Sequence, residues 1–342
     1  MTNRNAKWRM SIFTRLLHAI EMRNYISKEN VMKRNLLRIV IIYVVMISMS
    51  GWGFAQNLAA PYLQYSTSAM GASFGSAYTS LSEDASATYW NPAGLAGVKG
   101  FSFVGLASSG LALDRNFNAA SLALDMKKLG VIAVSFAMSG VKNIQGYDVA
   151  DTKTNVFDVV NMVPGISYAI RATPEFSFGT TVRYIRQDLK VQIDDGYSVD
   201  LGLRYLFNLS GTKIYTSGVV QNLFGKVGVN KLPKVMRIGL GASYGGIMKV
   251  GTLEGEVDYV VEDLSNSLNQ KYVNVGVGYE VNLRGFILSF QSGFQNGENF
   301  AAGAGIGMSM KMMLIRVDYA YVAEPSQIFT NSHRIGVTIS GK

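Results

Sequence analysis

The sequence contains no cysteine and only two histidines among its 342 residues. Without cysteine there is no disulfide, no thiolate metal site and no cysteine-linked lipid anchor. Because His18 lies in a segment expected to be removed, His333 is the one imidazole left for general-base or metal chemistry. Charged residues make up only 16% of the chain, against about 25% in an average soluble domain. These absences predict a protein that is not an enzyme and has no cofactor and no metal site.

The net charge of +9 is concentrated in the N-terminal part of the chain. Residues 1–55 hold nine lysines or arginines and two acids, a net charge of +7. The rest of the chain holds 23 basic and 21 acidic residues, a net charge of +2. The part that follows residue 55 is therefore nearly neutral, and nucleic acid is not an expected partner.

The basic N-terminal part ends in the pattern of an export signal. A basic stretch begins at Lys33, an apolar run covers 39–47, and small residues lead up to Ala55. This order predicts a signal peptide cleaved after Ala55. A transmembrane anchor is the alternative, although the run is short for about 30 Å of hydrocarbon. Met32 directly precedes the basic stretch, so either it is the true start or residues 1–31 form a long basic leader.

Residues 100–342 alternate between apolar and polar side chains, which is the pattern of a strand with two different faces. In 272–280, for example, valines and a tyrosine alternate with polar residues and glycines. Tight turns at 127–128, 172–174, 282 and 311 alternate with longer loops near 141–157, 224–234, 264–270 and 323–331. The predicted strands are 100–111, 115–126, 129–140, 158–171, 175–189, 196–207, 213–223, 235–246, 251–263, 271–281, 283–294, 298–310, 312–322 and 332–341.

The alternation alone also fits a soluble antiparallel sheet with one face in water. Two features favour a membrane: apolar faces often end in tyrosine or phenylalanine, as in an interfacial girdle, and no separate apolar element is left to cover them. In lipid the strands must close on themselves, because unpaired edge groups are costly there. The expected fold is all-β, a transmembrane antiparallel β-barrel of about 14 strands in the outer membrane, surrounded by outer-membrane lipid, with its longer loops outside.

Residues 56–99 are rich in small residues and show no long alternation. Such a stretch permits close backbone approach, so we expect it to thread the barrel as a hatch, or plug. A periplasmic tail with one short helix is the alternative. Asp84 can cap a short helix, and Asn91-Pro92 predicts a turn. We expect structural rather than chemical roles for Gly71, Gly75, Asp84, Ala85, Tyr89, Trp90, Asn91, Pro92, Ala93 and Gly94.

Two runs in this segment resemble the opening of PorV/PorQ-type proteins, which belong to the FadL-like superfamily of outer-membrane barrels. They are Met70-Gly71-Ala72-Ser73-Phe74-Gly75-Ser76-Ala77 and Glu83-Asp84-Ala85-Ser86-Ala87-Thr88-Tyr89-Trp90-Asn91-Pro92-Ala93-Gly94-Leu95-Ala96. The resemblance implies a fourteen-strand barrel with an N-terminal hatch, in a Gram-negative, Bacteroidetes-like bacterium. It also implies a role in the type IX secretion system, in which the barrel binds or shuttles exported cargo or partner subunits of the machinery without catalysis.

Two further functions stay open. A FadL-like transporter of hydrophobic small molecules would need an apolar pocket for its ligand beneath the hatch, whereas the inward-facing residues are mainly polar or glycine. A barrel with a purely structural duty is the third reading.

Catalytic and metal-binding readings find little support in the sequence. A barrel lipase would need a base beside its serine, but Ser332 and His333 are neighbours on a strand and should point to opposite faces. Four acids on one face of 253–262 could suggest Ca²⁺, but we interpret them as a polar lumen wall. The acids are Glu254, Glu256, Asp258 and Glu262, and the arginines expected to balance them are Arg183, Arg204, Arg237 and Arg316.

Overall fold

The structure is a computed structural model that describes residues 60–111, 115–190, 192–247, 250–264, 270–296, 299–323 and 331–341. The predicted leader, with cleavage after Ala55, lies outside these residues. No helix in the described part of the chain is both long and apolar enough to cross a membrane.

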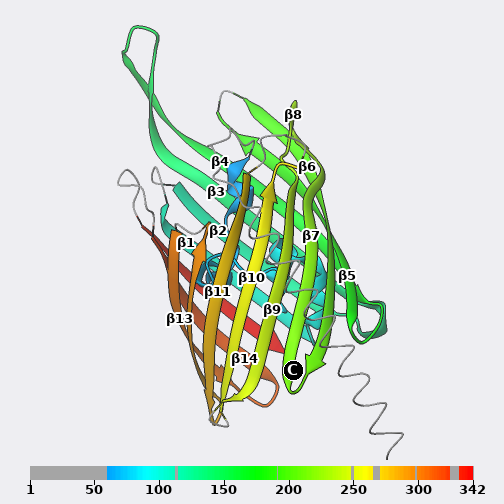
Figure 1. Ribbon diagram of the computed structural model, residues 1–342. Coiled ribbons are helices and arrows are strands. Elements are labelled where there is room, and N and C mark those ends of the chain that lie inside the picture. The colour runs from blue at the N-terminus through cyan, green and yellow to red at the C-terminus, as the bar shows by residue number, and fades with distance from the viewer. Residues whose placement is uncertain are drawn as a thin grey trace, which may run out of the picture. The chain divides into compact units, whose positions relative to one another are not determined.

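Fourteen long antiparallel strands and the two-residue strand β8 form one sheet, in which neighbours in the chain pair with each other. The sheet closes because β1 pairs with β15 and β6 with β7, so the predicted all-β barrel is confirmed (Figure 1). The strands are β1 (Phe101–Leu111), β2 (Arg115–Asp125), β3 (Val131–Tyr147), β4 (Lys153–Arg171), β5 (Phe176–Asp188), β6 (Ile193–Leu209), β7 (Thr212–Val227), β8 (Asn230–Lys231), β9 (Val235–Ile247), β10 (Gly251–Glu262), β11 (Gln270–Leu283), β12 (Phe286–Gln295), β13 (Asn299–Ser309), β14 (Met313–Val322) and β15 (Ser332–Gly341).

Several boundaries differ from the prediction. The predicted loop 141–157 is mostly strand, since β3 continues to Tyr147 and β4 starts at Lys153, and this hairpin extends past its neighbours (Figure 1). In 224–234, β7 continues to Val227 and β8 follows. The turn expected at Asn282 lies at 284–285 instead. The other two long loops fall largely outside the described residues.

The two faces of the strands differ as the alternation predicts. On β3 the apolar residues Ile132, Val134 and Phe136 are exposed on the outer face, while their neighbours point inward. The inner face carries buried serine, threonine, aspartate, glutamate and arginine side chains. Large apolar side chains exposed around a closed sheet are stable in lipid and not in water, so the outer face is a lipid-facing surface.

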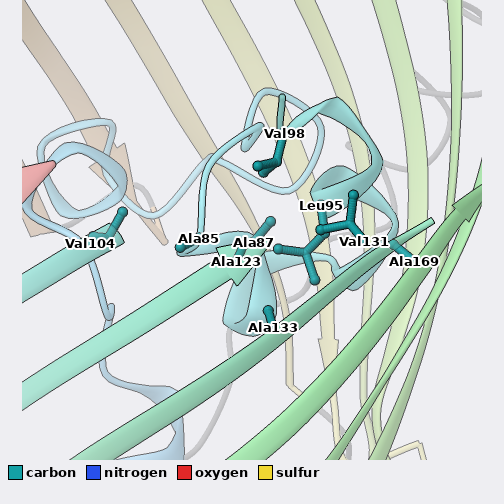
Figure 2. Close-up of a cluster of buried hydrophobic side chains, with 9 residues drawn as sticks. All are labelled: Ala85, Ala87, Leu95, Val98, Val104, Ala123, Val131, Ala133 and Ala169. Atoms are coloured by element: carbon teal, nitrogen blue, oxygen red, sulfur yellow. The ribbon is translucent and has the colours of Figure 1, made fainter. Parts of the chain in front are cut away.

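The hatch contributes four short helical segments: η1 (Pro61–Gln64), α2 (Ala69–Ser73), α3 (Ala87–Trp90) and η2 (Pro92–Gly97). Segments α3 and η2, with the residues beside them, pack against the inner faces of β1 to β4 in one apolar cluster (Figure 2). Its members are mainly alanine and valine, which let backbone elements approach closely. They are Ala85, Ala87, Leu95, Val98, Val104, Ala123, Val131, Ala133 and Ala169.

Candidate functional site: a hatch held inside the barrel

Local hydrogen bonds shape the hatch before any contact with the wall. The Ser68 hydroxyl accepts from the Gly71 N–H at 3.1 Å and so caps α2. The Asn91 side chain accepts from the Ala93 N–H at 3.1 Å, and Pro92 occupies the first position of η2. Asp84 Oδ1 accepts from the Ser86 N–H at 2.8 Å in a turn just before α3.

An aromatic cluster forms the centre of the hatch. The Trp90 ring meets those of Tyr89 and Tyr78 edge-on, with centroids 4.9 and 6.1 Å away, and is almost fully buried. Its indole N–H donates to Ser68 Oγ at 3.3 Å. Gly71 lies against the indole, where a Cβ would overlap the ring. Because Gly71 has no side chain, α2 packs directly against Trp90 of α3.

Glycines of the barrel wall make room for the hatch. Gly276, Gly278 and Gly293 surround Phe74, and any Cβ there would overlap its ring or backbone. The hatch residue Gly75, at φ 63°, lies against the backbone of Gly293 in the same contact. Other wall glycines meet other parts of the hatch, so the hatch lies directly on the strands: Gly179 and Gly202 meet the Asn91-Pro92 turn, Gly239 and Gly241 meet Ser80 and Leu81, Gly303 meets Ser73, and Gly336 meets Ala69.

Two buried acids of β10 hold the hatch loop 78–81 through its backbone. Asp258 Oδ2 accepts from the N–H groups of Tyr78 and Thr79, both at 3.2 Å, and from the Thr79 hydroxyl at 2.6 Å. Glu256 accepts from the N–H groups of Ser80 and Leu81. Hydrogen bonds to a buried carboxylate are among the strong ones, so this acid pair is a main attachment of the hatch.

Arginines of other strands hold the hatch directly, and among the described residues none of the four forms an ion pair with an acid of β10. Arg204 pairs with Glu83 of the hatch at 2.8 Å and donates to the Ser80 carbonyl at 2.9 Å. Arg183 donates to the Thr88 carbonyl at 2.9 Å and pairs with Asp200. The remaining two make different contacts: Arg316 pairs with Asp318 and Glu280, and Arg237 lies over the Trp90 ring and donates to Gln221.

The other motif residues are packed rather than exposed. Ala85 is fully buried and donates its N–H to Ser102 of β1 at 3.0 Å. Gly94 lies against the Ser82 carbonyl, where a Cβ has no room. Asn91 donates its amide to the Leu203 carbonyl of β6 at 3.1 Å. The motif residues thus make contacts within the hatch and between the hatch and the barrel wall, and no reactive group is among these contacts.

A small cavity lies between the hatch and strands β2 to β5. Its volume is about 30 Å³, room for a water molecule or two. Burial raises the pKa values of Tyr62 and Tyr89, two phenols in its lining. Sequence reasoning missed this cavity, whose lining is Tyr62, Leu63, Tyr65, Thr67, Thr88, Tyr89, Phe117, Ser121, Ser135, Phe136, Ala137, Ser139, Val163 and Arg183.

The wall beside this cavity contains a break in strand pairing. Residues Met162 and Gly165 of β4 pair with β5, but Val163 and Pro164 between them do not. Pro164 has no N–H to donate, and proline in a central strand normally removes a ladder hydrogen bond. Pairing of β4 with β3 continues unbroken past Pro164. The interruption at Pro164 therefore affects the pairing of β4 with β5 and not that of β4 with β3.

Ser332 and His333 lie on opposite faces of β15, as the alternation predicts. Ser332 is buried on the inner face, and His333 is exposed on the outer face. The His333 ring shares a 2.7 Å hydrogen bond with Tyr319 and lies near Tyr321. The pair therefore lacks the contact that a nucleophile and its base require.

No protein-family model matches the sequence, and no curated protein matches it. Among solved structures, the barrel is similar to the Pseudomonas putida toluene transporter TodX, with 11% identity, a TM-score of 0.50 and coverage of 80% of this chain and 97% of that one. A monoaromatic hydrocarbon channel, CymD, aligns at 10% identity and a TM-score of 0.48, covering 80% and 96%. A Pseudomonas aeruginosa FadL homologue aligns at 9% identity and a TM-score of 0.44, covering 85% and 99%. The closed barrel, its lipid-facing surface and the fold it shares with TodX make this chain an outer-membrane β-barrel protein.

Proposed function

We propose that the barrel passes small hydrophobic molecules across the outer membrane, by way of the cavity under the hatch and the break at Pro164. The observation that carries this proposal is that the cavity and the break in strand pairing lie side by side. Val163, at the break, and Phe136, which pairs with Pro164, both line the cavity. Val163 points inward and is buried, whereas Phe136 is 43% exposed on the lipid-facing side. The cavity therefore lies directly inside the wall at the break in pairing.

The inner side of the break is apolar, which supports a hydrophobic ligand. Tyr62 of the hatch packs with Val163, Ile185, Val227 and Leu232 of the wall and its loop. A ligand pocket of this kind is mainly apolar and aromatic, with a few polar groups that orient the ligand. The lumen is mainly polar, but at this place the hatch supplies aromatic rings for such a pocket.

The cavity as it stands is too small for an organic ligand, so passage requires a movement. Segment η1 carries Tyr62 and Leu63, and both side chains line the cavity. The N-cap of η1 has no side-chain hydrogen bond, unlike the caps of α2 and η2. We infer that a shift of η1 enlarges the cavity. The transported class would be monoaromatic or similar small hydrocarbons, which the shared fold with a toluene transporter supports.

Filling the cavity should block transport. In Ala137→Phe the new ring occupies the cavity from β3, and uptake of toluene into proteoliposomes should fall by roughly tenfold or more, because a packed site has no room for extra bulk. The matched control is Val134→Phe, which adds a phenyl ring on the exposed side of the same strand and should leave uptake unchanged. Wild-type uptake by folded Ala137→Phe barrels would contradict the proposal.

A second candidate function is a role in type IX secretion, in which the barrel binds exported cargo. The observation that favours it is the β3–β4 hairpin, which extends beyond the other strands and exposes Tyr147 at its tip (Figure 1). The resemblance of 70–96 to PorV/PorQ-type openings points the same way. Replacing 144–156 by a short turn should then leave proteins with a C-terminal sorting domain in the periplasm, as measured by fractionated proteomics. An unchanged surface proteome, with toluene uptake intact, would exclude this role.

A further inference from the structure

A second, larger cavity lies at the short-turn end of the barrel, where the hatch joins β1. Its volume is about 540 Å³, within the range of about 300–1,000 Å³ that is usual for ligand sites. The walls come from the end of the hatch, the β2–β3 turn and the end of β4. Val98, Val131 and Ala169, which belong to the apolar cluster of Figure 2, form its inner part. This cavity is separate from the one beside Pro164 and shares no lining residue with it.

The lining of this cavity is strongly basic. It contains four cations, Lys99, Lys127, Lys128 and Arg171, and one acid, Asp125, for a net charge of +3. Asp125 is already engaged, since its carboxylate accepts from the Lys127 N–H at 2.7 Å. Within the described ranges, none of the four cations forms an ion pair with a described carboxylate. Unpaired cations around one cavity attract an anion.

Arg171 is held in position for such an anion. Its Nη2 donates to the Ala96 carbonyl of the hatch at 2.7 Å, which leaves its other N–H groups free of any described partner. A guanidinium presents its donors in a fixed fork that fits phosphate and carboxylate oxygens. The three lysines add mobile charges around it.

Apolar groups on the outside of the same turn place this cavity at the membrane surface. Leu129 is 69% exposed, and Met126 and Ile170 are exposed as well. Tyr168 donates from its hydroxyl to the Leu129 carbonyl at 2.7 Å, as an aromatic residue at a lipid–water boundary commonly does with a polar group. Basic residues that follow an apolar surface at this depth can reach lipid headgroups.

We propose that the basic cavity binds the phosphate of an anionic phospholipid from the leaflet that meets the short-turn end of the barrel. The phosphate contacts Arg171, Lys127 and Lys128, and Lys99 adds to the positive potential. The acyl chains lie outside the barrel along Leu129 and Ile170. Zwitterionic phosphatidylcholine carries its own cation beside the phosphate, so it should bind more weakly than phosphatidylglycerol.

Native mass spectrometry of the full barrel in detergent tests this assignment with phosphatidylglycerol and phosphatidylcholine as probes. The wild type should retain phosphatidylglycerol, and the variant Lys127→Gln/Lys128→Gln/Arg171→Gln should bind it roughly tenfold or more weakly, since three cations near the lipid phosphate are lost. A charge-matched control, Lys142→Gln/Lys153→Gln/Lys231→Gln, removes three exposed lysines near the other end of the strands and should bind as the wild type does. Equal binding by both variants overturns the proposal.

A second measurement on the wild type avoids the question of whether the variant folds. Phosphatidylglycerol nanodiscs should protect Lys127 and Lys128 from an amine-acetylating reagent, relative to phosphatidylcholine nanodiscs, while Lys142 stays equally reactive in both. Equal reactivity of Lys127 and Lys128 in the two lipids overturns the site. If millimolar inorganic phosphate displaces phosphatidylglycerol from the detergent-solubilised barrel, the site is one for free anions and the lipid assignment is wrong.

Discussion

Replacing Asp258 by alanine is expected to release the hatch from the barrel wall. The carboxylate accepts three hydrogen bonds from Tyr78 and Thr79, and its removal leaves two buried hatch N–H groups without an acceptor. The cost should be about 3 to 5 kcal/mol, because each buried N–H group left without an acceptor costs about 1–3 kcal/mol. That corresponds to a rise of roughly a hundredfold or more in the population of barrels with an unseated hatch. Ion conductance in planar bilayers and proteolysis within 70–96 should both increase.

Glu254→Ala is the matched control for this variant. Glu254 lies on the same face of β10, but its carboxylate accepts from Ser243 of β9 and not from the hatch. Its loss should leave conductance and proteolysis close to those of the wild type. If both variants open the barrel equally, the effect comes from a general weakening of β10, and the role assigned to Asp258 is wrong.

Gly293→Val is expected to displace the hatch at a second contact, where Phe74 and Gly75 lie against β12. A Cβ at this position overlaps the backbone of Phe74 and Gly75, which cannot move aside as a flexible side chain would. Overpacking of this kind costs about 1–3 kcal/mol, and more where backbone is involved. The barrel itself should still close, because valine is favourable in a strand. Heat modifiability on gels should therefore stay normal while conductance rises.

Gly218→Val on β7 is the control, since no atom lies within 4 Å of the Cβ that this glycine lacks. Conductance of this variant should match that of the wild type. If Gly293→Val leaves the barrel closed and the hatch resistant to protease, the prediction is wrong. Phe74 and Gly75 would then be able to move away from the wall more easily than their contacts indicate.

Period-two alternation was enough to predict the barrel strands, because each strand separates lipid from a polar interior. The pattern failed where that separation ends. The sequence of the extension of β3 and β4 around Tyr147 alternates weakly and predicts a loop, whereas the structure has strand there. The break at Pro164 had a signal in the sequence, since proline is rare in a central strand. The predicted strand 158–171 simply ran through it.

The motif in 70–96 pointed to the hatch, but its contacts with the wall could not be inferred. Asp258 and Tyr78 are 180 residues apart, and alternation says only that Asp258 faces inward. Acids and arginines on one interior surface suggested mutual pairing, whereas backbone N–H groups of the hatch compete for the acids and are nearer. The glycines that face Phe74 were visible on the inward side of their strands, yet their partner was not.

The pairing of β1 with β15 has a consequence for how the protein is made. These strands meet from Ser102 opposite Ser340 to Ser109 opposite His333, so the contact joins the beginning and the end of the barrel sequence. One edge of β1 pairs with β2, and its other edge has no partner until β15 pairs with it. The hatch is joined to β1 through the few residues between Val98 and Phe101. If the hatch lies against β10 to β13 before β1 and β15 pair, the barrel closes around it and the hatch need not be threaded into a finished ring. The order of these two steps therefore decides whether the closed barrel contains its hatch.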